Sequence, residues 1–443
     1  MSLNLSVVGL GKLGAPVAAC LASCGFQVIG VDLDRQKVEA INRGEPPVYE
    51  PGLDDLMACT RKYLSATQDI NEAVLQSSAT FVILPTLSKP DQVYTLDYIL
   101  PACESIAKAL VSKDEFHLVV ISSTVMPGST EGILKTRVEK LSGGRCGQKF
   151  GLCYNPEFMA IGSVIRDFLN PDFVLIGESE TRSGDRLEGI YRKILGEKPE
   201  IVRTNPVNAE LTKLAINCFI TTKITFSNQL AQICELLPGA NVDIVASAVG
   251  LDSRIGPKYL KGGLGYGGPC FPHDNRAMMS LTHRLGIEAP LSEVTDSINR
   301  NEVGRIATIV KNNLPEGGIV GILGLAYKPE TNVIEESQGL FLAEELAAQD
   351  IPVIAYDPLA ADRVKEKTRF PIQIVDSAED CLKNADIVVL TTPWDEFQHL
   401  KVPDGREKRP LVIIDCWRLL EPDLIDDYIT YIAIGVGPPA GDG

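Results

Sequence analysis

The feature that most constrains the fold is the stretch LNLSVVGLGKLGAPVAACLASCGFQVIGVDLD at residues 3–34. Its first apolar run, residues 5–8, predicts a buried strand, and three glycines in GxGxxG spacing then open a helix. Asp32 lies 18 residues after Gly14, at the end of a second predicted strand. Strand, glycine turn, helix and strand in this order predict the first unit of a dinucleotide-binding α/β fold.

Each residue type in this turn has a physical task. Gly9 permits the tight turn, Gly11 lets a pyrophosphate approach the backbone, and Gly14 lets the helix pack closely on the strand. Free N–H groups at the helix N-terminus favour the negative phosphates. Asp32 can accept hydrogen bonds from the adenosine ribose and would repel a 2′-phosphate, so we expect NAD rather than NADP. A glycine turn without a ligand is the alternative.

The alternation of strands and helices continues to about residue 200. Apolar runs at 81–85, 117–123 and 172–177 predict further strands of one doubly wound domain. Ligands of such sheets bind beyond the carboxyl ends of the strands. Besides the three glycines and Asp32, the predicted cofactor-binding residues are Lys12, Leu13, Lys37, Thr86 and Thr124.

A long helix is predicted from Pro206 to about Leu237, because this segment has no glycine and its apolar residues recur at helical spacing. It is too long for the core of one small domain, so we expect it to link domains and to support a dimer. A second βα series follows after about residue 315 but lacks a full GxGxxG with an acidic strand end, so it is expected to bind something other than a second NAD. The expected fold is α/β, with two Rossmann-like doubly wound domains joined by a long central helix. The expected divisions are residues 1–200, 201–310 and 311–443.

Composition narrows the function classes. A chain of 443 residues with 45% hydrophobic and 23% charged residues is typical of a globular protein with two or three domains. The formal net charge of −16 argues against a nucleic-acid partner, which is bound through clustered Lys and Arg. The eleven cysteines have no CxxC or zinc-like spacing, so we expect reduced thiols, no metal site and a cytoplasmic protein. Residues 13–31 carry no formal charge, but Gly14, Pro16 and Gly25 break this run, so no membrane span is expected.

Two segments carry candidate chemistry. In GGLGYGGPCFPHD, residues 262–274, closely spaced glycines lead to Cys270, and Asp274 follows four residues later. This is either a tight loop with an incidental cysteine or a nucleophile placed where a substrate approaches the main chain. On the long helix, Glu210, Lys213 and Asn217 share one face, a pattern that by itself favours a solvated polar stripe over a functional site.

Taken together, the motifs resemble the nucleotide-sugar 6-dehydrogenase family, that is, the UDP-glucose and GDP-mannose dehydrogenases. The resemblance covers nearly the whole chain. Its signatures occur in order as GLGKLG with VDLD, EPPVYEPGL, SSTVMPG, NPEFMAIG, NAELTKLAIN, LDSRIGPKYLKGGLGYGGPCFPHD, GLAYKPET and YDP. It implies an N-terminal NAD domain, a helical dimerisation core and a C-terminal UDP-sugar domain.

The resemblance also implies a reaction, the four-electron oxidation of a sugar C6 hydroxyl to a carboxylate, most simply of UDP-glucose to UDP-glucuronate. Cys270 matches the family's nucleophile, which traps the aldehyde as a thiohemiacetal and then carries a thioester. Lys213 and Asn217 would stabilise the oxyanion at C6. Asp274 would assist proton transfer to a water, which Glu157 and Thr124 would position or activate.

Substrate contacts are implied residue by residue. Arg254 would reach the sugar nucleotide from the partner subunit of a homodimer, and Ile224 would help to wall the sugar and uridine. Plain core packing is the alternative for Tyr259 and Ile224. The predicted substrate-binding residues are Phe158, Met159, Ala160, Ile161, Lys213, Asn217, Arg254, Tyr259, Leu260, Lys261, Gly267, Phe271, Tyr327 and Lys328.

The chain departs from the family pattern at a few positions. His273 replaces a lysine before the aspartate, which makes a positive contact there weaker or dependent on pH. Ile161 stands where a second glutamate is usual. The other departures are Val333 for an aspartate, Glu335 for an arginine and Phe173 for the arginine of NPDR.

These departures leave other functions open. A UDP-N-acetylhexosamine or GDP-mannose could be the substrate instead. A sugar-nucleotide-binding protein with impaired catalysis is a further alternative, since Glu335 and Ile161 differ from the family. A two-electron hydroxyacid dehydrogenase would leave Cys270 without a task.

Overall fold

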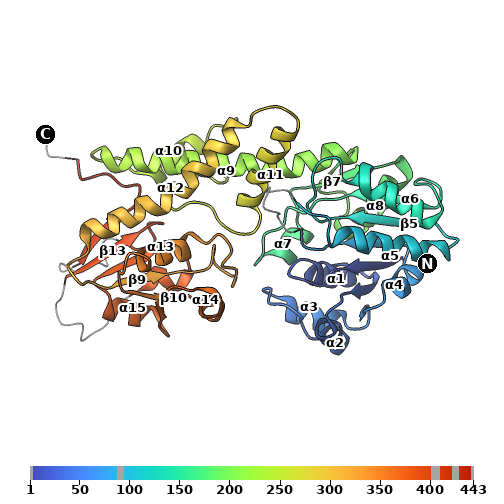
Figure 1. The fold of residues 1–443 in the computed structure, drawn as a ribbon, viewed down its shortest axis with the longest axis horizontal. Helices are drawn as coiled ribbons and strands as arrows, with labels where there is room; N and C mark the ends of the chain where they lie inside the picture. Colours follow the sequence, from blue (N-terminus) through green and yellow to red (C-terminus); the bar gives the residue numbers. More distant parts are fainter. Residues whose placement is uncertain (1–2, 87–93, 401–409, 422–428, 441–443) are drawn as a thin grey trace. The chain divides into compact units, whose positions relative to one another are not determined.

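The computed structural model describes residues 3–86, 94–400, 410–421 and 429–440 (Figure 1). The chain divides into two compact units, residues 1–215 and 216–443, and each is described by itself. Both are built on sheets in which parallel strands predominate, as the sequence predicts.

The first unit holds an eight-stranded sheet with the order β3-β2-β1-β4-β5-β6-β7-β8. Its strands are β1 Asn4–Val8, β2 Gln27–Val31, β3 Leu64–Thr67, β4 Ala79–Val82, β5 His117–Ile121, β6 Phe150–Tyr154, β7 Phe173–Glu178 and β8 Glu200–Thr204. The order reverses at the β1–β4 pair, which is where a doubly wound sheet opens its binding crevice. β6 and β7 pair antiparallel, whereas the other neighbours are parallel. The last two strands therefore run against the rest of the sheet.

Helices cover both faces of this sheet. They are α1 Gly14–Ser23, α2 Arg35–Arg43, α3 Leu53–Thr60, α4 Ile70–Gln76, α5 Ile99–Val111, the π-helix η1 Thr130–Leu134, α6 Lys135–Ser142, α7 Val164–Leu169 and α8 Thr181–Leu195. One apolar core joins the sheet to α1, α3, α7 and α8, and another joins it to α5 and α6. Phe81 belongs to the first core and Val82 to the second, because successive side chains of a strand point to opposite faces.

The predicted long helix is α9, Pro206–Leu236, with 31 residues. Proline at its first residue costs no hydrogen bond, because the amide there has no partner within the helix. No glycine interrupts it, so the helix continues across residue 215, where the first unit ends.

The second unit contains a six-stranded sheet with the order β11-β10-β9-β12-β13-β14, in which all neighbours are parallel. Its strands are β9 Val320–Leu323, β10 Val353–Tyr356, β11 Ile372–Ile374, β12 Ile387–Leu390, β13 Leu411–Asp415 and β14 Ile429–Ala433. Its helices besides α9 are α10 Val242–Gly250, α11 Phe271–Arg284, α12 Pro290–Asn313, α13 Gln338–Ala347, α14 Ala361–Lys367, α15 Ala378–Asn384 and the 3-10 helix η2 Asp395–His399. The second Rossmann-like domain is thus present.

The first turn of the second sheet repeats the geometry of the first. Gly324 has φ of 109°, like Gly9 with 99°, and in both turns the next amide donates to the aspartate that ends the neighbouring strand. Asp357, the counterpart of Asp32, is 1% exposed and also accepts bonds from the amides of Ala326, Leu359 and Ala360. A carboxylate used in this way by its own chain is poorly placed to bind a ribose. That this domain binds a different ligand stays a prediction.

In the part of the chain that the structure describes, no helix is both long and apolar enough to cross a membrane.

Candidate active site

The glycine turn after β1 has the geometry that a dinucleotide needs. A Cβ on Gly9 would lie 2.2 Å from the carbonyl oxygen of Ile83, and one on Gly14 would lie 1.8 Å from that of Gly9. A Cβ on Gly11 would meet no atom within 4 Å, so a phosphate can approach this backbone closely. Gly9 and Gly14 thus require glycine for close packing, and Gly11 leaves room for a ligand.

Asp32 is held at the end of β2 by the glycine turn itself. Its Oδ2 accepts a hydrogen bond from the Leu10 amide at 2.8 Å, and its Oδ1 accepts one from the Asp34 amide at 2.9 Å. Lys37 Nζ lies 3.3 Å from Oδ2, so a cation accompanies the carboxylate. This rigid placement suits an acceptor for ribose hydroxyls.

The remaining cofactor candidates lie around the same crevice of the first unit. Lys12 and Leu13 are half-buried in the glycine turn. Thr86 follows β4 and Thr124 follows β5, and these two strands are neighbours in the sheet. Both threonines are half-buried. Residues 87–93 lie outside the described residues.

Lys213 is buried on α9 and contacts Glu157. Its Nζ donates to the backbone carbonyl of Glu157 and lies 3.5 Å from Oε1 of the same residue. It also lies 5.1 Å from the centre of the Phe158 ring. The lysine side chain is only 5% exposed, so its charge is held in a largely dry environment beside a carboxylate.

The segment after Glu157 is fixed by a residue to which the sequence analysis assigned no role. Glu50, in the motif EPPVYEPGL, is 2% exposed and accepts hydrogen bonds from the amides of Gly162 at 2.9 Å and Val164 at 2.7 Å. A glutamate inside a quoted motif was the available signal. Of the predicted substrate residues here, Met159 and Ile161 are half-buried and Ala160 is exposed.

Phe173 has a structural partner at the position of the expected arginine. Its ring centre lies 5.0 Å from that of Phe158, the residue that follows Glu157. An aromatic pair therefore occupies this place, and the loss of the arginine is matched by apolar packing.

In the second unit, Asn217 on α9 donates a hydrogen bond from Nδ2 to Oδ2 of Asp274 in the first turn of α11. Asn217 is 6% exposed and Asp274 is 1% exposed. The polar face predicted on the long helix is therefore buried, and the alternative of a solvated stripe is wrong. Glu210 on this face accepts bonds from the amides of Gly128 and Thr130, so it serves a structural role.

Cys270 is the N-cap residue of α11 and is exposed. The positive end of the helix dipole favours negative charge close to the sulfur. Asp274 lies one turn further on, and its amide donates to the carbonyl of Cys270 at 2.8 Å. Asn275, which the sequence analysis did not single out, is fully buried and donates to Thr221 Oγ1 at 2.7 Å, which ties this turn to α9. The thiol and the buried carboxylate thus belong to one rigid helix start.

The glycines before Cys270 let the loop pack closely against other segments of the second unit. A Cβ on Gly267 would lie 2.2 Å from the carbonyl oxygen of Glu336, and one on Gly268 would lie 2.5 Å from the ring of Tyr327. The Gly268 amide also donates to the Glu335 carbonyl at 3.0 Å. The loop therefore needs glycine for close packing at these positions, in addition to any approach of a substrate. This packing places Tyr327, from the turn after β9, beside the loop.

Aromatic side chains gather around Phe271. Its ring lies edge-to-face with Tyr259 at 6.2 Å and with Tyr266 at 6.3 Å between centres. Tyr259 has φ of 65° and is 48% exposed, so plain core packing is not its situation, whereas Leu260 is buried. Ile224 is half-buried on α9.

The cationic candidates of this unit differ in their surroundings. Arg254 is exposed and forms an ion pair with Asp252 at 2.6 Å. Lys261 is exposed, and Lys328 Nζ lies 5.9 Å from the centre of the Tyr327 ring.

Three departures from the family pattern, at His273, Val333 and Glu335, have defined local surroundings. Burial and the nearby charge of Arg276 lower the pKa of His273, so this residue is neutral at pH 7 and does not replace a lysine's charge. Val333 is 3% exposed and packs as an apolar side chain. Glu335 forms a long ion pair with Lys367 at 3.8 Å, both side chains being well exposed.

Comparison with known proteins identifies a family that has both a dinucleotide-binding domain and a second Rossmann-like domain. Three family sequence models match in chain order. They are the NAD binding domain of the UDP-glucose/GDP-mannose dehydrogenase family over residues 3–195, its central domain over 207–301 and its UDP binding domain over 321–422. The chain belongs to the UDP-glucose/GDP-mannose dehydrogenase family. It is an NAD-dependent dehydrogenase of nucleotide sugars.

Individual members of the family are similar to this chain over nearly their full length. The chain is 36% identical to the UDP-glucose 6-dehydrogenase AglM of Haloferax volcanii, over 94% of this chain and 97% of that one. It is 32% identical to the GDP-mannose 6-dehydrogenase of Pseudomonas aeruginosa, over 93% and 96%. The solved UDP-glucose dehydrogenase of Pyrobaculum islandicum superimposes with a TM-score of 0.89 at 31% identity and covers 98% of both chains. Relatives with different sugars thus share this fold, and family membership alone does not fix the substrate.

Proposed function

We propose that this enzyme oxidises the C6 hydroxyl of UDP-glucose to the carboxylate of UDP-glucuronate, through a covalent bond between the substrate and Cys270. The observation that carries the proposal is the start of α11, where an exposed thiol lies one turn before a buried carboxylate that Asn217 holds. A hydroxyacid dehydrogenase would have no task for this thiol. Relatives named UDP-glucose 6-dehydrogenase support the choice of sugar.

The proposed reaction proceeds in balanced steps. Bound NAD supplies the hydride acceptor for both oxidations, and two NAD are reduced for each sugar. The C6 alcohol loses a hydride and a proton to give an aldehyde, and the Cys270 sulfur adds to its carbonyl carbon to form a thiohemiacetal. Loss of a second hydride and a proton gives a thioester. Water then cleaves the thioester to the carboxylate and restores the thiol.

Side chains of this chain stabilise each stage. The Lys213 ammonium and the Asn217 amide are proposed to donate to the oxygen that develops negative charge at C6, an effect worth about 2.7–4 kcal/mol for a well-placed donor. Asp274 accepts and returns the proton of the hydrolytic water. Glu157 and Thr124 are proposed to orient that water.

The nucleotide would be held by the remaining candidates. Tyr259, Phe271 and Tyr327 offer aromatic faces, and Lys261 and Lys328 offer positive charge for the diphosphate. We retain the three functional divisions 1–200, 201–310 and 311–443 as part of this proposal, together with a cytoplasmic location.

A homodimer is proposed because apolar side chains are exposed along α9 and α10 at heptad spacing. Phe219, Phe226 and Ile233 recur every seven residues on α9 and are 64%, 48% and 53% exposed. Ile244 on α10 and Leu251, the C-cap residue of that helix, repeat the spacing, at 70% and 87% exposed. A second copy of the chain would bury this surface and bring the exposed Arg254 to its partner's substrate site.

The test is a count of NADH for each sugar consumed. Purified protein with NAD is incubated with UDP-glucose, GDP-mannose and UDP-N-acetylglucosamine in parallel, and products are separated by anion exchange. Two NADH and an acid from UDP-glucose, with much slower turnover of the other sugars, is the expected result. A single NADH would exclude the thioester route, faster turnover of another sugar would reassign the substrate, and no turnover of any sugar would favour a binding protein.

A further inference from the structure

Arg418 lies three residues after the end of β13, in a backbone conformation that arginine rarely adopts. Its φ is 56°, in the left-handed region that favours glycine and asparagine. Its side chain is only 8% exposed. A strained backbone and a buried guanidinium together require compensating contacts.

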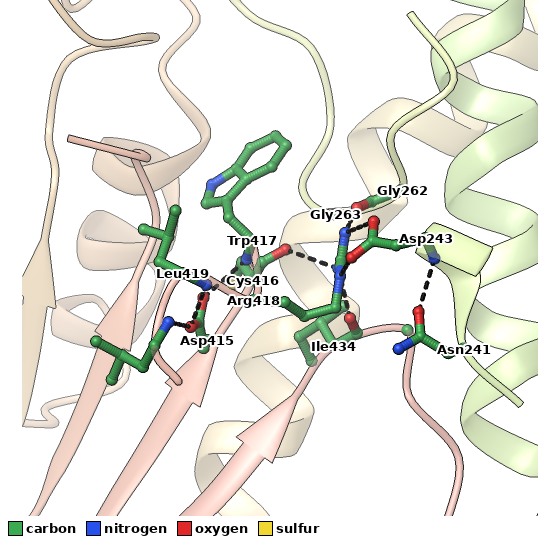
Figure 2. Close-up of polar contacts among 12 residues, drawn as sticks. Asn241, Asp243, Gly262, Gly263, Asp415, Cys416, Trp417, Arg418, Leu419 and Ile434 are labelled. Carbon is green, nitrogen blue, oxygen red and sulfur yellow. Dashed lines mark hydrogen bonds and ion pairs between the residues drawn. The ribbon is translucent and has the colours of Figure 1, made fainter. Parts of the chain in front are cut away.

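The guanidinium makes five hydrogen bonds to four residues (Figure 2). Nε and Nη2 donate to the two carboxylate oxygens of Asp243 on α10, at 2.6 and 2.8 Å. Nη2 also donates to the carbonyl of Gly262 at 2.7 Å. Nη1 donates to the carbonyls of Ile434, just after β14, at 2.6 Å and Cys416 at 3.5 Å. One side chain therefore joins α10, the C-terminal sheet and the first residue of the glycine loop.

The loop is confined where Arg418 binds it. A Cβ on Gly262 would lie 2.7 Å from the carbonyl oxygen of Ser227 on α9, and one on Gly263 would lie 2.8 Å from that of Cys416. Asn228 on α9 accepts a bond from the Gly263 amide at 2.9 Å and donates one to the Leu264 carbonyl at 3.1 Å. The loop thus enters in close contact with α9 and with the end of β13.

Further along, the loop has neutral anchors. Asn299 on α12 binds both the amide and the carbonyl of Tyr266, at 2.7 and 3.0 Å, and Gly268 binds the Glu335 carbonyl. Cys270 follows two residues after Gly268. Among these anchors Arg418 is the one that uses an ion pair, and it fixes the start from which the loop runs to the thiol.

We propose that Arg418 is a positioning residue for Cys270, acting through the Gly262 carbonyl while Asp243 fixes the direction of the guanidinium. The inference rests on the proposed function of Cys270 as the nucleophile. Its physical basis is that a displacement of about 1 Å at a reacting atom can cost on the order of 100-fold in rate. A positive charge alone is insufficient to hold the loop, because a lysine cannot bind the two carboxylate oxygens of Asp243 and the carbonyl of Gly262 together, as the planar guanidinium does.

The test compares Arg418→Lys and Arg418→Ala with Arg305→Lys. Arg305 is the matched control, since it is a poorly exposed arginine of the same unit that pairs with Glu302 and Glu235 and, among the residues that the structure describes, makes no bond to the glycine loop. Two readouts are measured, kcat with UDP-glucose and the rate of Cys270 alkylation by iodoacetamide, followed on the Cys270 peptide by mass spectrometry. Melting temperatures report any general loss of stability.

We expect both Arg418 variants to lower kcat by about 10- to 100-fold and to change the Cys270 alkylation rate at least about threefold, whereas Arg305→Lys leaves both within about twofold. Millimolar guanidinium chloride should restore part of the kcat of Arg418→Ala. A role in stability alone predicts no such gain at a temperature where the variant is fully folded, since millimolar guanidinium is far below denaturing concentrations.

Unchanged kcat and alkylation in the Arg418 variants, or changes equal to those of Arg305→Lys, would overturn the inference. The outcome is separable from the proposed function. If the unaltered protein oxidises no nucleotide sugar, the proposed function fails, and the alkylation rates still decide whether Arg418 positions the thiol.

Discussion

The amide of Asn217 donates to the carboxylate of Asp274, and both side chains are buried at the start of the helix that Cys270 caps. The bond joins α9 to α11 and leaves Asp274 with a defined direction. A buried carboxylate without such a donor would be strongly destabilised. The pair therefore connects the fold of the second unit to its proposed chemistry.

Replacing Asn217 by alanine should lower kcat about 100- to 1,000-fold, because it removes a proposed oxyanion donor. It should also lower the free energy of unfolding by about 1–3 kcal/mol, because Asp274 loses a buried partner. Steady-state kinetics and urea denaturation measure the two effects. Asn208→Ala is the control, since the side chain of this exposed α9 residue donates from Nδ2 to the nearby Thr204 Oγ1, and its loss should change neither quantity appreciably. Equal kcat values in the two variants would remove Asn217 from the site.

Cys270→Ala should abolish acid formation and leave the dissociation constant for UDP-glucose within about threefold, since the sulfur bonds the substrate only after the first oxidation. Product analysis and calorimetric titration give the two values. Cys59→Ala, which removes another exposed thiol, should behave like the unaltered protein. Acid formed at the normal rate by the Cys270 variant would exclude a covalent route.

Asp32→Ala should weaken NAD binding by about 10- to 100-fold relative to NADP, because a charged acceptor for the ribose is lost and the repulsion of a 2′-phosphate disappears. Fluorescence titrations with NADH and NADPH measure the ratio. Asp34→Asn keeps the cap of α2 and should leave the preference unchanged. An unaltered ratio in Asp32→Ala would mean that this carboxylate does not contact the ribose.

Stability should fall in acid partly through His117. Burial, aided by Lys113, lowers the pKa of His117 from 6.5 to about 3. Below pH 6.5 the unfolded chain binds a proton that the folded chain rejects, so the free energy of unfolding decreases by up to about 1.4 kcal/mol per pH unit down to about pH 3. The contribution is fully present above pH 6.5.

Urea denaturation at pH 7, 6 and 5 would measure how the free energy of unfolding depends on pH. His117→Gln should reduce that slope by up to about 1.4 kcal/mol per pH unit, the contribution of one proton. His283→Gln, at an exposed position, should leave the slope unchanged. The same slope in both variants would show that His117 is not the group responsible.

Local patterns determined much of this protein from the sequence by itself. The GxGxxG turn with Asp32, the uninterrupted helix from Pro206 and the spacing of Cys270 and Asp274 depend on neighbouring residues, so they could be read before the fold was known. The periodicity of the apolar runs likewise predicted two Rossmann-like sheets.

Only the tertiary structure decided which side chains meet. The antiparallel β6–β7 pairing, the contact of Glu50 with the amides of Gly162 and Val164, and the reach of Arg418 to Gly262 join residues far apart in the sequence. No local pattern encodes these contacts, because a buried polar group takes whichever partner the folded chain brings within about 3 Å. The buried state of the Lys213 and Asn217 face was settled in the same way, by the segments that pack over it.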